Sequence, residues 1–431
     1  MSSHLAQSPA PPPRGTGSAQ PLGVEAGRGP HARSADSPRL LREINDQLVL
    51  RLLLEEGPLT RGQVGGLTGL SKPTVSALLG RLTERGLVTT TGVVEGGPGP
   101  NARIYAMDGG AAHVIGVHVE QHGSIAALAD LTGEVSATYS VEVPARRGSS
   151  PLAEVSAAVD GVLAATGLSR TDIHHVVIAT PGVIDPVTGA LRHARHIRGW
   201  EAPGLHDDLA AALGVPVSHG NDVNLAAVAE GVTGAARNRS DYALLWLDRG
   251  VGLGLVLGGS LRTGAHGGAG EIGYLPVPGI ERHRVDRGAP GGFQQLVGGQ
   301  GIRALAKRFG IRGTSPAAIV GAAAAAGSGA AGDAFLAELA DGIALGATAV
   351  STLLDPGLLV LGGPVAQAGG AALVHQVVTL MKQESFVRPE VVLSGLTGDG
   401  VLHGAIEVAL QGVRSRLFGE PVAALSGSVV G

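Results

Sequence analysis

The chain has 431 residues, more than one ordinary hydrophobic core accommodates, so two or three domains are expected. Hydrophobic residues make up 44% of it and charged residues 16%, with a formal net charge of -4, so overall charge neither attracts nor repels nucleic acid and any DNA contact has to come from a local patch. The sequence contains no cysteine, which excludes disulfides, thiol nucleophiles and cysteine-based zinc sites and is typical of a cytosolic protein.

The N-terminal segment, residues 1–38, is rich in proline, glycine, serine and alanine and lacks the apolar core of a signal peptide. This composition predicts a disordered tail. Beyond it, no segment supplies about 18 uninterrupted apolar residues, so no membrane-spanning helix is expected.

The next segment predicts three helices followed by a hairpin. Apolar residues recur at helical spacing in the first helix, at Leu40, Leu41, Ile44, Leu48 and Leu52. Thr60 and Ser71 are candidate N-caps of the second and third helices, and Pro73 fits the first turn of the third. Two short β-like stretches then flank the turn "GGPGP".

The third of these helices carries an apolar stripe at Val75, Leu78, Leu79 and Leu82, which leaves a small, polar and basic outward face. This order of elements predicts a winged helix-turn-helix over residues 39–108, whose third helix enters the major groove of DNA. The alternative is an ordinary helical bundle with solvated charges. The candidate DNA contacts are Thr60, Arg61, Ser71, Lys72, Thr74, Ser76, Arg81 and Arg103.

The remainder of the chain twice repeats the order three strands, helix, strand, helix. This pattern predicts an α/β fold of the actin-like ATPase (ribonuclease H-like) type, in which two related lobes enclose a cleft. The expected lobes are residues 112–235 and 236–400, with a C-terminal helix at 402–417 packing back on the first lobe.

Five motifs occur in order along this region: "PGVIDPVTG", "RGWEAPGLHDDLAAALGVPVSHGNDVNLAAVAEG", "GAHGGAGEIGYLPV", "DPGLLVLGGPVAQAG" and "SGLTGDGVLHGAIEVAL". Through them the sequence resembles the ROK family of repressors, open reading frames and sugar kinases, from about Arg39 to Phe418. The N-terminal winged helix is similar to the family's repressor branch, whereas the kinase branch lacks it.

The resemblance also shows what has changed at the phosphate loops. The family's kinases carry "DxGGT", where glycines admit the phosphates and the aspartate organises Mg²⁺. Here His118 replaces that aspartate, while Glu120, Gln121 and His122 replace the glycines and threonine. In the second loop, "GTGxG" becomes "DRGVG", with Asp248 in place of glycine. We therefore expect no competent ATP site and no catalytic residues.

The family's zinc-binding "CxCGxxGCxE" is also replaced, by "HRVDRGAPGGFQQ". Phe293 stands where the last cysteine would be, and Gln295 stands where the sugar-contacting glutamate would be. His283 alone does not make a zinc site, so we expect neither a metal nor a cofactor.

The sugar pocket of the family is retained in part. The resemblance implies that Asn221, Asp222 and Glu271 hydrogen-bond sugar hydroxyls, with Tyr274 in place of a histidine and Gln295 as a further contact. For Asp222, two alternatives remain: it caps the helix that follows, or it is a catalytic base.

Together these observations predict a homodimeric or homotetrameric, cytoplasmic transcriptional regulator, most simply a repressor, that binds double-stranded operator DNA and a sugar or sugar derivative. One alternative is a bifunctional sugar kinase and regulator. The other is a regulator whose ligand-free sensor is a scaffold that docks another protein.

Overall fold

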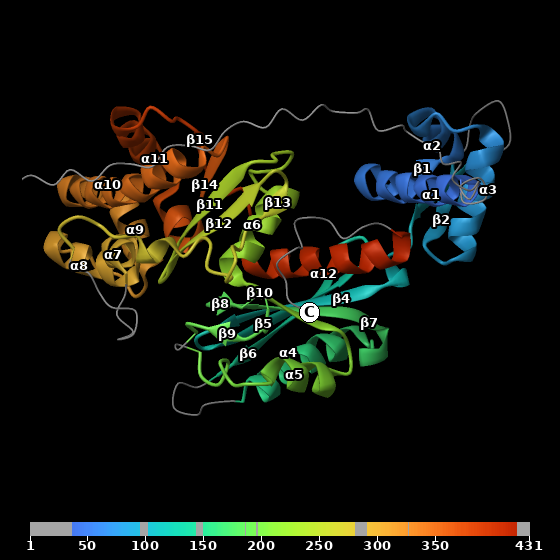
Figure 1. Cartoon of the computed structure of the whole chain (residues 1–431), viewed down its shortest axis with the longest axis horizontal. Coiled ribbons are helices and arrows are strands. Elements are labelled where there is room, and N and C mark those ends of the chain that lie inside the picture. Colours follow the sequence, from blue (N-terminus) through green and yellow to red (C-terminus); the bar gives the residue numbers. More distant parts are fainter. Residues whose placement is uncertain are drawn as a thin grey trace, which may run out of the picture. The chain divides into compact units, whose positions relative to one another are not determined.

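The computed structural model describes seven stretches of the chain, which Figure 1 draws as ribbon: residues 37–94, 102–143, 150–185, 187–194, 197–280, 291–325 and 327–419. The chain divides into two compact units, Met1–Arg42 and Glu43–Gly431. In the first unit, only the start of helix α1 (Ser37–Glu56) is described, so almost all of the expected tail at 1–38 lies outside the described residues.

The N-terminal part of the second unit is a winged helix. Its elements after α1 are β1 (Leu59–Thr60), α2 (Arg61–Thr68), α3 (Lys72–Glu84), β2 (Val88–Val94) and β3 (Ala102–Met107). The three strands form an antiparallel sheet in the order β1-β3-β2. Because the wing strands flank residues 95–101, the predicted turn "GGPGP" lies outside the described residues.

Local signals explain the helices of this domain. The Thr60 hydroxyl accepts from the Gln63 backbone N–H, and the Gln63 side chain accepts from the Thr60 N–H, which makes a capping box at α2. Ser71 caps α3 by accepting from the Thr74 N–H. Both predicted N-caps are confirmed. The predicted apolar stripe of α3 is buried as well: Val75, Leu78, Leu79 and Leu82.

The first helix buries a different face from the one its spacing indicated. Three residues of the predicted stripe are exposed, namely Leu41, Ile44 and Leu48. The core instead contains Val49, Leu50 and Leu53. The run "LVLRLLL" places apolar residues on two sides of one helix, so periodicity alone does not decide which side packs.

The rest of the second unit consists of two lobes, each built on a five-stranded sheet. The first sheet has the order β10-β7-β4-β5-β6. Its elements are β4 (His113–Glu120), β5 (Gly123–Asp130), β6 (Val135–Glu142), α4 (Pro151–Thr166), β7 (Ile173–Thr180), α5 (Leu205–Leu213), β10 (Val217–Asn221) and α6 (Asp222–Val232). Strands β4, β5 and β6 are antiparallel neighbours, while β4, β7 and β10 run parallel.

The second lobe repeats this plan with the order β13-β12-β11-β14-β15. Its strands are β11 (Tyr242–Leu247), β12 (Val251–Leu257), β13 (Ser260–Leu261), β14 (Leu358–Gly362) and β15 (Glu390–Leu393). Its helices are α7 (Gly292–Val297), α8 (Gly299–Phe309), α9 (Pro316–Ala324), α10 (Gly329–Leu354) and α11 (Gly363–Glu384). The expected repeat of three strands, helix, strand and helix is confirmed, and with it the fold class.

The last helix, α12 (Gly400–Phe418), returns to the first lobe, as expected. It packs against β4, β7 and α6 (Figure 1). Its apolar side chains join a core that these elements share. Gly404 makes this approach possible, because a Cβ there would lie 1.9 Å from the Leu225 carbonyl oxygen of α6.

Short elements complete the described chain. They are the strands β8 (Val183–Ile184) and β9 (Leu191–Arg192), which pair with each other, and the 3-10 helices η1 (Gly109–Ala111), η2 (Arg170–Asp172) and η3 (Ile272–Tyr274). Among the described helices, α10 alone is long and apolar enough to cross a membrane. It packs in the core of the second lobe, as the core helix of a globular domain does.

Candidate ligand cleft and DNA-binding face

A cleft of about 1030 Å³ is lined by residues of both lobes. The carboxyl ends of β4 and β10, the hairpin between β11 and β12, and the N-termini of α6, α11 and α12 meet there. Ligand sites of open α/β sheets lie at this end of the strands, because loops and helix N-termini converge on it. Four of the five predicted ligand residues line the cleft: Asn221, Asp222, Glu271 and Tyr274.

The chain passes directly from β10 into α6 at Asn221 and Asp222. The Asn221 Oδ1 accepts from the Asn224 N–H at 3.0 Å, and its Nδ2 donates to the Gly182 carbonyl oxygen at 2.9 Å. Asn221 is therefore the N-cap of α6. The alternative in which Asp222 is the cap is wrong, because Asp222 is already the first helical residue and only accepts from its neighbour Val223.

Two of the carboxylates that line the cleft, those of Asp222 and Glu271, are held in an environment that disfavours their charge. Burial raises the pKa of Asp222 to about 6, although the nearby His118 opposes this shift. Burial, and then the charge of Asp222, raise the pKa of Glu271. A carboxylate with a raised pKa regains favourable interactions when a ligand supplies hydroxyl or amine donors, so this pair is suited to binding a polyhydroxylated molecule.

Gln295 differs from the other predicted ligand residues. It is absent from the cleft lining, whereas its neighbour Gln294 is present. Gln294 accepts from the Val251 N–H at 2.8 Å and donates to the Arg249 carbonyl oxygen at 2.7 Å. Successive residues of a helix point about 100° apart, so α7 can present one of the two glutamines to the cleft. Within α7, Gln294 lines the cleft, and a direct ligand contact by Gln295 stays a prediction.

The two loops that the resemblance aligns with the kinases' phosphate loops carry side chains that line the cleft. His118, Glu120, Gln121 and His122 line the cleft at the end of β4, and Asp248 and Arg249 line it at the end of β11. Arg249 Nη1 donates to Gln121 Oε1 at 2.8 Å, which joins the two loops across the cleft. Burial raises the pKa of Asp248.

A second long-range contact at the cleft joins His118 to Asp399. His118 Nδ1 lies 2.7 Å from Oδ2 of Asp399, the residue that caps α12. Burial disfavours the imidazolium, but the hydrogen bond to Asp399, together with the charges of Asp399, Asp222 and Glu120, raises the pKa of His118. Burial also opposes the charge of Asp399, whereas His118 and two backbone N–H groups lower the pKa of that carboxyl. Because the Asp399 carboxylate can only accept, His118 Nδ1 donates in this contact, which is an ion pair when the imidazole is protonated.

Within the part of the chain that the structure describes, no cluster of three or more His, Cys, Asp or Glu side chains is arranged to hold a metal ion. His283 and most of the segment that replaces the family's zinc motif fall in residues 281–290, outside the described residues.

The predicted DNA-binding face lies on α2, α3 and the wing. Lys72 and Thr74 are exposed at the N-terminal end of α3, and Arg103 is exposed on β3. Arg61 Nη1 donates to the Ser76 hydroxyl at 3.0 Å, which joins α2 to α3. Ser71 and Thr74 share a hydroxyl hydrogen bond of 2.8 Å. Thr60 and Ser71 are used as caps, so their side chains already have intramolecular partners.

Arg81 differs from the other candidates. Its Nη2 lies 2.6 Å from Oδ1 of Asp46, a buried residue of α1. Arg81 is seven residues beyond Thr74, about 10 Å further along α3, where the first helix is within reach. Its guanidinium therefore joins two helices of the domain, and a contact between Arg81 and DNA stays a prediction.

Comparison with protein families agrees with both parts of this architecture. A ROK family model matches residues 114–411, which is more than half of the chain. The chain belongs to the ROK family. A MarR family model matches residues 47–97 of the winged helix.

Individual relatives of this ROK protein include both regulators and kinases. The chain is 27% identical over 240 residues to the DNA-binding transcriptional dual regulator NagC of Escherichia coli K12, covering 55% of this chain and 58% of NagC. It is 28% identical over 277 residues to a glucokinase of Halalkalibacterium halodurans, covering 60% and 82% of the two chains. The chain thus spans little more than half the length of the regulator it matches.

The solved structure of a ROK family transcriptional regulator, a homologue of the E. coli MLC protein, matches with a TM-score of 0.68 at 20% identity. The match covers 86% of this chain and 96% of that chain. At this identity the likeness shows the fold.

Among the residues of this ROK domain's cleft that sequence reasoning missed are Arg249, Gln294 and Asp399. Arg249 follows the predicted loop residue Asp248, and Gln294 precedes the predicted ligand residue Gln295. The motifs therefore indicated the right segments, and the prediction named the adjacent residue in each. Asp399 carried the signal of an N-cap, an aspartate before "GVLHGAIEVAL", but its contact with His118 spans 281 residues and leaves no local trace.

Proposed function

We propose that this protein is a DNA-binding transcriptional repressor whose ROK domain binds a sugar or sugar derivative in the cleft. We assign residues 39–108 to operator binding, and residues 112–235 with 402–417 and 236–400 to the two lobes of the sensor. The observation that carries the proposal is the presence, in one chain, of a MarR-like winged helix and a ROK cleft whose phosphate loops are filled by side chains.

The exposed N-terminal end of α3 supports the DNA-binding part. In helix-turn-helix proteins the N-terminal residues of the recognition helix reach the base edges. Here Lys72 and Thr74 occupy those positions, with Arg61 beside them on α2. One such helix reads only a few base pairs, so we propose that a homodimer or homotetramer binds a palindromic operator in the cytoplasm.

The hydrogen-bonding groups of the cleft support the proposal that its ligand is a sugar. Asn221, Asp222 and Glu271 present several hydrogen-bonding atoms within one cavity, and Tyr274 adds an aromatic ring with a hydroxyl group at its edge. Adjacent hydroxyls of a pyranose match this set, because each buried acceptor that stays unpaired costs about 1 to 3 kcal/mol.

The rival function is that of a sugar kinase, since glucokinases are among the relatives. The Arg249 to Gln121 hydrogen bond and the Glu120 carboxylate argue against it, because they stand where the family's kinases leave space for phosphates. The second rival, a ligand-free scaffold, is disfavoured by the polar side chains that converge in the cleft and by the raised pKa of Asp222, since perturbed pKa values cluster at functional sites.

Two measurements test the proposal. Selection from fragmented genomic DNA should enrich a palindromic site that the full-length protein binds far more tightly than random DNA at physiological salt. Thermal-shift screening against D-glucose, D-xylose and N-acetyl-D-glucosamine, with and without ATP and Mg²⁺, should reveal stabilisation by a sugar and none that depends on the nucleotide. Failure to enrich any site would refute the regulator, and stabilisation that requires ATP would favour the kinase.

A further inference from the structure

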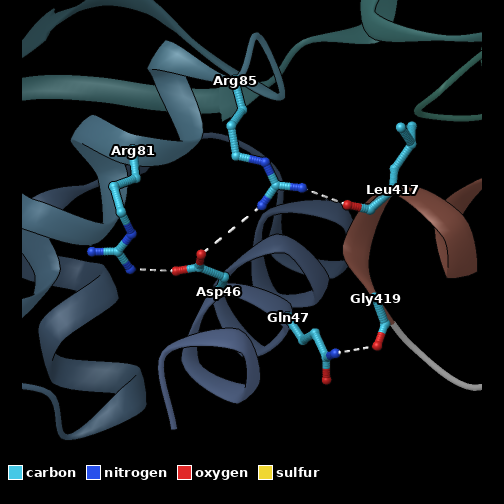
Figure 2. Close-up of polar contacts among 6 residues, drawn as sticks. All are labelled: Asp46, Gln47, Arg81, Arg85, Leu417 and Gly419. Carbon is cyan, nitrogen blue, oxygen red and sulfur yellow. Dashed lines mark hydrogen bonds and ion pairs between the residues drawn. The ribbon is translucent and has the colours of Figure 1, made fainter. Parts of the chain in front are cut away.

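We propose that α12 transmits the state of the cleft to the winged helix, with the His118 and Asp399 pair at its first turn and Arg85 and Gln47 at its last carbonyls. The inference rests on the proposed function only in taking operator binding as the activity that is controlled. The coupling between the cleft and the winged helix through α12 does not depend on bound DNA. Figure 2 shows the contacts at the far end of this helix.

The N-terminal end of α12 lines the cleft. Oδ1 of Asp399 accepts from the N–H groups of Val401 and Leu402, both at 3.0 Å, and so caps the helix. Its other oxygen accepts from His118, which stands at the former phosphate loop. The first turn of α12 is therefore fixed by a side chain that lines the cleft.

This end also lies where the chain leaves the second lobe. Strand β15 ends at Leu393, and only residues 394–398 separate it from Asp399. The Ser394 carbonyl oxygen accepts from Gln367 of α11, which holds the connection to the second lobe. A change in the angle between the lobes consequently acts on Asp399 through a short tether.

At its other end, α12 is bound by side chains of the winged helix. Arg85 Nη2 donates to the Leu417 carbonyl oxygen at 2.6 Å, and Gln47 Nε2 donates to the Gly419 carbonyl oxygen at 2.7 Å (Figure 2). The last carbonyls of a helix have no partner within it and carry its negative dipole end, so a guanidinium is a favourable partner there.

Asp46 joins helices α1 and α3 of the winged helix. Its carboxylate lies 2.6 Å from Arg81 and 4.0 Å from Arg85, so α1, α3 and the residue that follows α3 share one buried charge (Figure 2). Arg85 is the C-cap of α3, whose first turn forms the proposed base-reading surface. The orientation of α3 is thus tied, through Arg85, to the end of α12.

Between its two ends α12 is packed tightly enough to move as one body. It has 19 residues, about 28 Å of helix, and 13 of them are buried. Its close approach to α6 at Gly404 couples the middle of the helix to that neighbour, so the two helices are expected to move together. A displacement at Asp399 is therefore carried to Leu417 rather than absorbed along the way.

Hydrogen exchange in the full-length protein without DNA tests the proposal. His118→Ala removes the contact at the cleft end, and it should speed amide exchange in residues 72–84 by about 5-fold or more, the lower end of typical coupling. In the background Arg85→Ala with Gln47→Ala, the same His118→Ala change should add nothing. His118→Gln, which retains a donor for Asp399, should behave like the wild type.

Arg416→Ala is the matched control, because Arg416 is an exposed arginine on α12 that contacts the His174 carbonyl oxygen instead of the winged helix. It should leave the response to His118→Ala intact. Unchanged exchange in residues 72–84 of His118→Ala, or an equal change with and without Arg85 and Gln47, would overturn the proposal. If His118→Ala does not fold, the comparison of His118→Gln with Asp399→Asn gives the same test.

Operator binding provides a second readout that separates this inference from the proposed function. If the wild type selects an operator, His118→Ala should shift its affinity, and the shift should vanish when Arg85 and Gln47 are replaced. If the wild type selects none, the regulator is refuted, while the exchange experiment still decides whether α12 couples the two sites.

Discussion

Arg249 and Gln121 meet across the cleft, where the guanidinium of one donates to the amide oxygen of the other at 2.8 Å. The two residues stand at the former phosphate loops of the two lobes and are separated by 128 positions in the chain. The contact is a direct connection between the lobes, at the positions where the family resemblance places the phosphate loops of the kinases.

The first prediction concerns catalysis. In a coupled ADP-release assay with a hexose panel, ATP and Mg²⁺, we expect no turnover above background, because the loops carry Glu120, Gln121 and Asp248 in place of small residues. Turnover within the usual kinase range of about 1 to 100 per second, abolished by Asp222→Asn, would contradict this and make the protein a kinase.

The second prediction concerns the ligand response. Asp222→Ala should leave operator binding intact and remove the response to the sugar identified by thermal shift, because the change is in the cleft and far along the chain from α3. Asp222→Asn should do less harm, since its amide oxygen still accepts a hydrogen bond. Operator titration with and without that sugar measures both. A full response in Asp222→Ala would place the sensing site elsewhere.

The third prediction uses the pKa of Asp222, which lies at about 6 in the folded protein against an ordinary value of 3.8. For an acid with a raised pKa, stability is greatest below the ordinary value and falls as the pH rises through the folded value. Asp222→Asn removes this loss. Its free energy of unfolding should exceed that of the wild type by up to about 3 kcal/mol at pH 8.

The gain from Asp222→Asn should shrink between pH 8 and pH 5, because the wild-type carboxyl becomes protonated over that range. Denaturant unfolding at a series of pH values measures the difference. A gain that stays constant with pH would mean that Asp222 is ionised throughout and that its environment is more polar than its burial indicates.

The fourth prediction separates two basic residues of α3. Lys72→Ala should weaken operator binding by about 1 to 3 kcal/mol if it contacts a base, or uniformly across sequences with a smaller salt dependence if it contacts a phosphate. Arg81→Ala should mainly lower stability, because it leaves the buried Asp46 carboxylate without its closest partner. Fluorescence anisotropy at several salt concentrations, beside thermal unfolding, distinguishes the two effects. If Arg81→Ala weakens operator binding as much as Lys72→Ala does and leaves stability unchanged, Arg81 contacts DNA.

The fifth prediction tests the packing of α12. Gly404→Ala should destabilise the protein by about 1 to 3 kcal/mol, because its Cβ would collide with the Leu225 carbonyl oxygen. Gly80→Ala is the control: Gly80 lies within α3, and a Cβ added there would meet no heavy atom within 4 Å, so this change should stabilise by about 0.5 to 1 kcal/mol. If both changes stabilise, α12 does not approach α6 as closely as the position of Gly404 indicates.

The sequence alone determined the elements and their order. The caps at Thr60 and Ser71, the stripe of α3 and the repeated strand pattern are signals between residues a few positions apart, and the backbone geometry of a helix or strand turns them directly into structure. The cleft residues Asn221, Asp222, Glu271 and Tyr274 were also predictable, because the family motifs carry them at the ends of such elements.

Only the tertiary structure decided which side of an element faces which partner. It exposed Leu41 and Ile44, presented Gln294 rather than Gln295 to the cleft, and turned Arg81 toward Asp46. A helix with apolar or polar residues on two sides satisfies the same periodicity in either rotation, so its neighbours choose between them. The contact between His118 and Asp399 depends on the return of α12 to the first lobe, and no local pattern records such a long-range approach.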